Sequence, residues 1–123
     1  YLAGHQINSV SFMGMGEPFA NPNLFDALKI LTNPSLFGLS QRRITISTIG
    51  MIPGIKRLTR DFPQANLAFS LHSPFEKQRS ELMPINQTYP LHKVMDALDA
   101  HVANTKRRLF LAYIMLGGIN DSA

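Results

Sequence analysis

The stretch VSFMGMGEP, residues 10–18, joins a short apolar segment to a turn that contains two glycines and ends in a glutamate and a proline. The apolar segment predicts a β-strand, and the glycines let the backbone after it approach a ligand closely. Parallel α/β proteins bind ligands at the carboxyl ends of their strands, where Gly16 and Glu17 stand. A tight strand-to-helix connection is the commoner reason for such a turn, so its meaning depends on the segments downstream.

Four segments have the pattern of short β-strands. They are residues 9–13, 43–48, 66–71 and 108–115. A helical pattern follows each of the first three, which makes the order of elements βαβαβαβ. This order predicts an α/β fold with a parallel sheet and right-handed crossovers. The chain begins almost inside a strand and stops soon after the fourth, so we expect residues 1–123 to be one fragment of a larger barrel or sheet.

Capping residues set the expected helix starts. Asn21 is expected to cap the first helix and Pro53 to open the second. Residues 73–76, SPFE, have the form of a capping box and predict a short helix that ends before Pro84. A longer helix is expected from about Pro90, with one apolar stripe facing the core. The stripe consists of Leu91, Val94, Met95, Leu98 and Val102.

Composition narrows the class of protein. The 123 residues fit one domain, and a hydrophobic content of 45% is ordinary for a globular protein. No membrane-spanning run or signal peptide is visible, so we expect a soluble, cytoplasmic protein. The chain has no cysteine, so ligands for an iron–sulfur cluster must come from outside it. The net charge of +4 suits a polyanionic partner, but a bland solvated surface explains it equally well.

Alternation along the first three strands separates a bulky face from a small, partly polar face. The bulky face carries Val10, Phe12, Ile44, Ile46, Leu67 and Phe69. The other face carries Ser11, Met13, Thr45, Ser47, Ala68 and Ser70. The bulky face is expected to meet the helices. The polar face indicates a lumen that admits a polar ligand, unless its hydroxyls only bond to neighbouring backbone.

The same alternation places Ser47 and Ser70 at the carboxyl ends of consecutive strands, level with Glu17. A carboxylate and two hydroxyls suit a zwitterionic nucleoside such as S-adenosylmethionine, which carries an ammonium group, a carboxylate and a ribose. His72 follows the third strand and is expected to be a hydrogen-bonded support. The remaining histidines have no motif around them and are expected at the surface or in caps. They are His5, His92 and His101.

Four motifs in a fixed order resemble the Cfr/RlmN family, the radical S-adenosylmethionine methyltransferases that modify an adenine of 23S ribosomal RNA. The motifs are FMGMGEP at 12–18, RRITIST at 42–48, SLHSP at 70–74 and MPIN at 83–86. The resemblance runs from about Ser9 to Asp121. It is closer to the Cfr-like chloramphenicol-florfenicol resistance branch, which attacks carbon 8 of the adenine. Pro18 is typical of the RlmN form, which attacks carbon 2.

The resemblance implies a parallel segment of a radical-SAM partial TIM barrel, here a fragment without the cluster-binding CxxxCxxC motif and without the methyl-carrying cysteine. It implies S-adenosylmethionine and a [4Fe-4S] cluster as cofactors of the parent enzyme, with no catalytic residue or metal ligand in this fragment. The residues implied to contact S-adenosylmethionine are Gly16, Glu17, Ser47, Ser70, Leu71 and His72.

The parent enzyme would then give resistance to ribosome-targeting antibiotics. The isolated fragment is expected to be inactive and to self-associate through its open sheet edges. The alternatives are a housekeeping carbon-2 methyltransferase of the RlmN type and a non-catalytic nucleotide- or RNA-binding module that shares the sheet.

Overall fold

The computed structural model describes residues 7–121, which contain one sheet of four parallel strands in the order β1-β2-β3-β4. The strands are β1 (Val10–Phe12), β2 (Ile44–Thr48), β3 (Asn66–Ser70) and β4 (Leu109–Ala112). Neighbouring strands pair in register, with Ser47 opposite Ala68 and Ser70 opposite Ala112. The expected parallel α/β order is confirmed.

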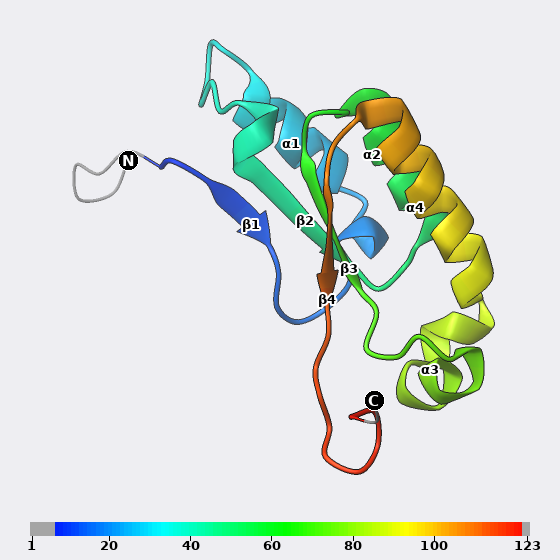
Figure 1. The fold of residues 1–123 in the computed structure, drawn as a ribbon. Helices are drawn as coiled ribbons and strands as arrows, with labels where there is room; N and C mark the ends of the chain where they lie inside the picture. Colours follow the sequence, from blue (N-terminus) through cyan, green and yellow to red (C-terminus); the bar gives the residue numbers. More distant parts are fainter. Residues whose placement is uncertain (1–6, 122–123) are drawn as a thin grey trace.

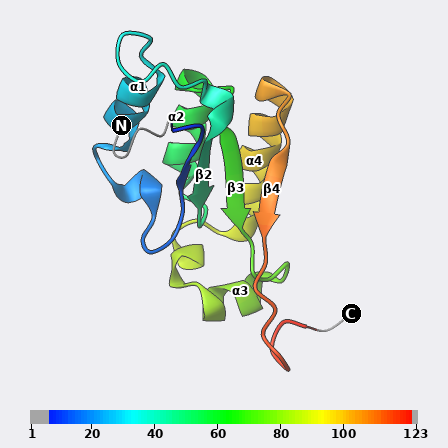
Figure 2. The same cartoon turned by 90° about the vertical axis from the view of Figure 1, so that its left-hand side faces the viewer.

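The helices connect consecutive strands, as the crossover pattern predicted. They are α1 (Leu24–Thr32), α2 (Ile52–Asp61), α3 (Glu76–Leu82) and α4 (Leu91–Thr105), with short 3-10 turns at Pro18–Ala20 (η2), Gln41–Arg43 (η3) and Pro84–Gln87 (η4). In Figures 1 and 2, α1, α2 and α4 lie on one face of the sheet, and α3 lies beyond the ends at which the strands finish. No helix of residues 7–121 is long and apolar enough to cross a membrane.

The core lies between the bulky face of the sheet and the helices. Ile44, Ile46, Leu67 and Phe69 are all 0% exposed. Burying a side chain of this size contributes about 1.5–3 kcal/mol. The opposite face carries Thr45 and Ser47, which are partly exposed, and Figure 2 looks onto this face with no helix in front of it. The predicted division into a buried bulky face and an open polar face is confirmed.

Two predicted helix starts differ from the structure. The N-cap of α1 is Asn23, not Asn21, and the side chain of Asn21 instead accepts a hydrogen bond from the N–H of Asn23 at 2.9 Å. The prediction of a capping box at 73–76 is also wrong, because α3 begins at Glu76 with Phe75 as its N-cap. Glu76 accepts from the N–H of Leu91 at 2.9 Å, because η4 brings the start of α4 beside α3. A distant backbone donor has replaced the local one.

The fourth strand and the last helix are less regular than the pattern predicted. Strand β4 ends at Ala112, and beyond it Asn120 accepts a hydrogen bond from the N–H of Leu116 at 2.6 Å. This side chain holds the segment as a loop. On α4, Met95 and Val102 are 36% and 38% exposed, so the apolar stripe is only partly covered in residues 7–121.

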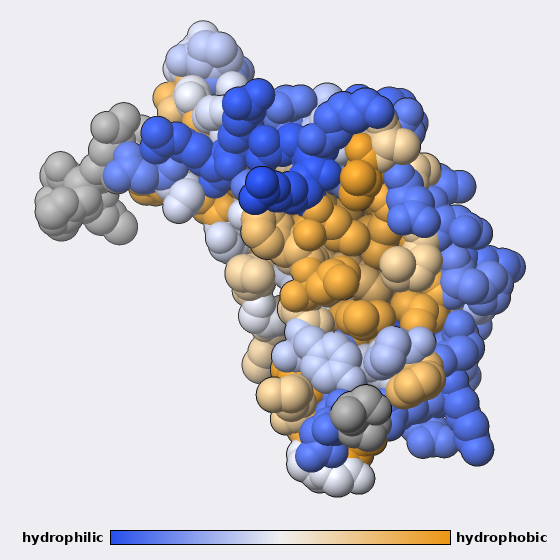
Figure 3. Space-filling view, in the orientation of Figure 1, coloured by the Kyte–Doolittle hydropathy of each residue, from blue (hydrophilic) through white to orange (hydrophobic). Residues whose placement is uncertain are grey.

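Exposed apolar side chains gather along β4 and the loop after it. Phe110, Leu111, Ile114 and Met115 are 53%, 57%, 60% and 76% exposed. Figure 3 shows apolar surface in the middle of this side of the molecule, below a strongly hydrophilic band at the amino ends of the strands. Basic residues stand just before β2 and β4; they are Arg42, Arg43, Lys106, Arg107 and Arg108.

Candidate cofactor-binding site

The expected site residues lie at the carboxyl ends of β1, β2 and β3. Gly16 and Glu17 follow β1, Ser47 lies in β2, and Ser70 ends β3. The serines are not level, because Ser47 pairs with Ala68 and Ser70 therefore stands two residues further along. At a rise of about 3.3 Å per residue, this places Ser70 about 6.6 Å nearer the end of the sheet. The residues thus outline a sloping surface.

The carboxylate of Glu17 ties the turn after β1 to the end of β2. Its Oε1 accepts hydrogen bonds from the N–H of Phe19 at 3.1 Å and from the hydroxyl of Thr48 at 2.9 Å. Its Oε2 accepts from the N–H of Ile49 at 2.7 Å. A carboxylate offers about four lone-pair sites, so about one, on Oε2, is left for a ligand. Sequence reasoning did not identify Thr48 as the partner of Glu17.

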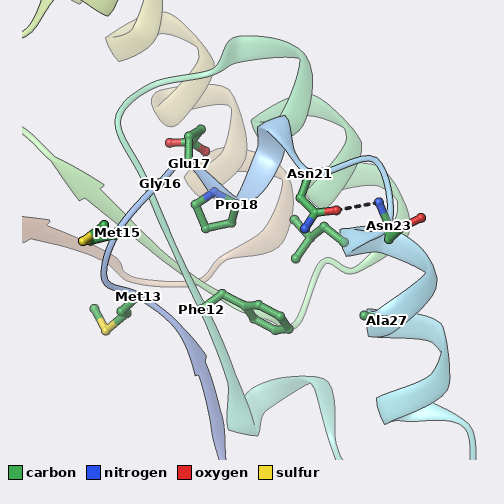
Figure 4. Close-up of a pocket in the computed structure, with 10 residues that line it drawn as sticks. Phe12, Met13, Met15, Gly16, Glu17, Pro18, Asn21, Asn23 and Ala27 are labelled. Carbon is green, nitrogen blue, oxygen red and sulfur yellow. Dashed lines mark hydrogen bonds between the residues drawn. The ribbon is translucent and has the colours of Figure 1, made fainter.

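The glycines of the turn are required by backbone conformation. Gly14 and Gly16 have φ angles of 107° and 91°, where L side chains are strained, although a Cβ on either would meet no atom within 4 Å. A hollow of about 400 Å³ lies between this turn and α1, and neither Ser47 nor Ser70 lines it. In Figure 4, the Glu17 side chain points away from Phe12 and Ala27 at this hollow.

The polar face of the sheet holds a second hollow, of about 330 Å³. Its lining includes Met13, Thr45 and Ala68 from the face predicted to admit a polar ligand, but neither Ser47 nor Ser70. The rest of the lining is Asn66 and, from β4, Phe110, Leu111 and Ala112, so the hollow is mainly apolar. The hydroxyls of Ser47 and Ser70 make no hydrogen bond to another residue in 7–121, so the alternative of simple bonding to neighbouring backbone does not hold for these two serines. Both serines are partly exposed, and their hydroxyls have a donor and acceptors free for a ligand.

Leu71 and His72 form the bend after β3. The N–H of Leu71 donates to Ala112 at 3.0 Å, and its carbonyl accepts from the N–H of Ser73 at 2.7 Å. Because its backbone groups are used and its side chain packs against the core, Leu71 can offer a ligand only van der Waals contact. His72 has a φ of 56°.

The imidazole of His72 holds the loop after β4. The ring Nδ1 accepts a hydrogen bond from the N–H of Ile114 at 3.1 Å. The backbone carbonyl of His72 accepts one from the side-chain amide of Asn120 at 2.6 Å. Burial, followed by the charge of Arg79, lowers the pKa of His72. The ring is therefore neutral at pH 7, with its proton on Nε2. The expected hydrogen-bonded support is confirmed, and contact with S-adenosylmethionine stays a prediction.

Sequence reasoning missed Arg79, which is 0% exposed. Its guanidinium donates to backbone carbonyls after β2 and at the end of β3, and to the side chain of Asn86. Burial lowers the pKa of Arg79, and the charge of Glu76 opposes this effect. The MPIN motif was the available signal, since Asn86 is its last residue and is 1% exposed.

The other histidines only partly follow expectation. His92 is exposed, and its Nδ1 lies 3.7 Å from Oε2 of Glu76. His101 was expected at the surface or in a cap, which is wrong: it is 0% exposed, and its Nδ1 lies 2.8 Å from the hydroxyl of Thr59. His5 lies outside the described residues. In residues 7–121 no three His, Asp or Glu side chains gather into a possible metal site.

Comparisons with known proteins agree with the motifs. No protein-family model matches the chain. Over 122 residues, 99% of the chain, it is 76% identical to "Ribosomal RNA large subunit methyltransferase Cfr" of Lachnoclostridium phytofermentans and 65% identical to the protein of that name from Bacillus velezensis. A crystal structure of a radical SAM methyltransferase from Sphaerobacter thermophilus matches 98% of the chain with a TM-score of 0.90 and 40% identity.

The chain spans 36% of the Lachnoclostridium protein, 35% of the Bacillus protein and 36% of the crystallised chain. It therefore corresponds to about a third of each. These proteins match the chain along nearly its whole length, which confirms the predicted resemblance to the radical S-adenosylmethionine methyltransferases of the Cfr/RlmN family.

Proposed function

We propose that the chain is the S-adenosylmethionine-positioning segment of a longer radical SAM methyltransferase that methylates an adenine ring carbon of 23S ribosomal RNA. The observation that carries this proposal is the 76% identity to a Cfr methyltransferase over 99% of the chain. By this similarity the carbon attacked is carbon 8, the product gives resistance to ribosome-targeting antibiotics, and the enzyme works in the cytoplasm. Pro18 alone favours the RlmN-type carbon-2 alternative.

The geometry at the strand ends supports the cofactor assignment. The hydroxyls of Ser47 and Ser70, which have no partner in residues 7–121, would bond the ribose or the carboxylate of S-adenosylmethionine. The free lone pair on Oε2 of Glu17 would accept a hydrogen bond from its ammonium. The exposed backbone at Gly16 would allow close approach, and the Nε2–H of His72 would donate a hydrogen bond.

The cofactors supply the radical chemistry that an unreactive aromatic carbon requires. The donor groups of this segment suit S-adenosylmethionine but do not suit the [4Fe-4S] cluster, because the chain contains no cysteine. The role of this segment is therefore to bind and orient the sulfonium cofactor. The cluster ligands and the methyl-carrying cysteine belong to other parts of the parent enzyme, and the isolated segment is expected to be inactive.

The second candidate is a non-catalytic nucleotide- or RNA-binding module. The basic residues before β2 and β4 favour it, because none of them lies within 4.0 Å of a carboxylate in residues 7–121. The two candidate functions predict different sequences upstream in the parent gene. A CxxxCxxC motif there supports the methyltransferase, and its absence supports the binding module.

The direct test uses the full-length parent with Ser70→Ala or Glu17→Ala and locates methylated adenine in ribosomal RNA by mass spectrometry. Loss of a hydrogen bond to a charged ligand group costs about 1.5–3 kcal/mol, or roughly a 10- to 150-fold loss of affinity. Ser35→Ala, which removes an exposed hydroxyl from the loop after α1, is the matched control and is expected to leave methylation unchanged. Undiminished methylation in both site variants would overturn the assignment.

A further inference from the structure

Arg79 has the largest of the fully buried side chains in residues 7–121. Its guanidinium reaches two neighbouring strand ends from α3. Nε donates to the carbonyl of Leu71 at 3.1 Å, and Nη2 donates to the carbonyls of Ser70 at 3.2 Å and Ile49 at 2.8 Å. One planar group therefore joins the backbone just after β2 to the backbone at the end of β3.

The positive charge of this group is compensated in an unusual way. No carboxylate oxygen lies within 4.0 Å of the guanidinium among the described residues. Carbonyl dipoles surround it instead, and its Cζ lies 5.0 Å from the centre of the Phe69 ring. Burying an unpaired cation is costly, so an arginine at this position needs all of these partners.

Asn86 orients the guanidinium from the opposite side. Its Oδ1 accepts from Nη1 of Arg79 at 2.5 Å, and its amide donates to Glu76 at 2.7 Å and to Ser80 at 2.8 Å. Glu76 thus acts on Arg79 through Asn86. This arrangement gives the MPIN motif a physical role, because its asparagine fixes the direction in which the fork of the guanidinium points.

The carbonyls that Arg79 holds belong to the candidate cofactor site. Ser70 and Leu71 are two of the residues implied to contact S-adenosylmethionine, and Ile49 is held from both sides. The N–H of Ile49 donates to Glu17 at 2.7 Å, while its carbonyl accepts from Arg79 at 2.8 Å. A continuous set of hydrogen bonds therefore runs from the glycine-rich turn through β2 to the end of β3.

We propose that Arg79 is a positioning residue of the cofactor site: it sets the spacing between the carboxyl ends of β2 and β3, and thereby the distance between Ser47 and Ser70, without touching the cofactor. This role rests on the proposed function and deepens it. The fixed fork geometry is essential, because an ammonium group has neither the reach nor the planar arrangement of donors to hold three carbonyls at once.

The test measures binding of S-adenosylmethionine by equilibrium dialysis to the full-length, cluster-reconstituted protein carrying Arg79→Lys. We expect a roughly 10- to 100-fold higher Kd and a matching rise in KM for S-adenosylmethionine. The KM for RNA and the iron content are expected to stay at wild-type values. Arg107→Lys is the control: Arg107 is partly buried and donates to Asn66, but at the amino end of the sheet. Its Kd for the cofactor is expected to be unchanged.

Asn86→Ala provides a graded second variant, because it leaves the carbonyl bonds of Arg79 in place and is expected to weaken cofactor binding less than Arg79→Lys. A folded Arg79→Lys protein with wild-type Kd would overturn the positioning role. If Arg79→Lys does not fold, wild-type binding by folded Asn86→Ala would overturn it instead. If the wild-type protein binds no S-adenosylmethionine, the proposed function itself fails.

Discussion

Replacing Gly54 by alanine adds a methyl group that would overlap the side chain of Phe19, a residue of η2. A Cβ on Gly54 would lie 2.2 Å from Cγ and 2.5 Å from Cβ of Phe19. Carbon atoms in contact normally stand about 3.5–4.0 Å apart, so Phe19 has to move by more than about 1 Å. Because its own Cβ is among the atoms met, the backbone of η2 moves with it. The N–H of Phe19 donates to Glu17 at 3.1 Å, so the displacement reaches the candidate site.

The expected loss of stability follows from three contributions. Overpacking costs about 1–3 kcal/mol, and a contact this short belongs at the upper end. A weakened Phe19–Glu17 hydrogen bond adds about 1 kcal/mol. Alanine regains about 1 kcal/mol over glycine, because Gly54 lies within α2. The net loss is about 2–3 kcal/mol, which lowers Tm by about 3–4 °C in a protein about three times as long as this chain.

The assay is thermal unfolding of the full-length protein, followed by circular dichroism, together with its Kd for S-adenosylmethionine. Gly117→Ala is the control, since a Cβ on Gly117 meets nothing within 4 Å and its φ is not positive. We expect Gly54→Ala to unfold earlier and to bind the cofactor more weakly, while Gly117→Ala matches wild type. A Gly54→Ala protein that melts with the wild type would refute the close packing of α2 on η2.

Three further outcomes are expected. Thr48→Val removes one hydrogen bond to Glu17 and leaves the N–H groups of Gly50 and Met51 without their acceptor. The free energy of unfolding, measured with urea, should therefore fall by about 1–3 kcal/mol. Thr48→Ser keeps the hydroxyl and is expected to retain most of this free energy. Burial lowers the pKa of His101 below its unfolded value of 6.5, so the unfolded chain binds more protons and stability falls as pH drops below about 6.5. His101→Gln should flatten this part of the stability curve, and equal slopes in variant and wild type would contradict the buried neutral imidazole. The 123-residue chain on its own is expected to form dimers through the free edges of β1 and β4, and a monomer in light scattering would argue against this.

The strands and their faces could be predicted because alternation is a local property of the chain. Ile44 and Ile46 are buried where period-2 patterning placed them, and Ser47 faces the open side. Helix caps were harder to predict, because a capping side chain chooses among all donors within reach. Glu76 bonds to the backbone of Leu91, 15 positions away, and no local motif reports that proximity.

The candidate site also has one part that could be predicted from the sequence and one part that could not. Its place at the strand ends followed from the glycine-rich turn and from the serines in neighbouring strands. Arg79 was not found from the sequence, because an arginine on a short helix is ordinarily solvated and the MPIN motif contains only its partner Asn86. Its burial depends on the carbonyl of Ile49, 30 positions away, and on Asn86.

By itself, the sequence determined a parallel sheet, a polar face on that sheet and a glycine-rich turn beside it, since side-chain alternation and glycine conformation act over a few residues. Only the tertiary structure decided how the polar groups are used. It directs most of the acceptor capacity of Glu17 to Phe19, Thr48 and Ile49, and it encloses Arg79 between two strand ends. The physical reason is that burial and hydrogen-bond partners depend on contacts between residues far apart in the chain, and these contacts exist only once the sheet and helices have packed.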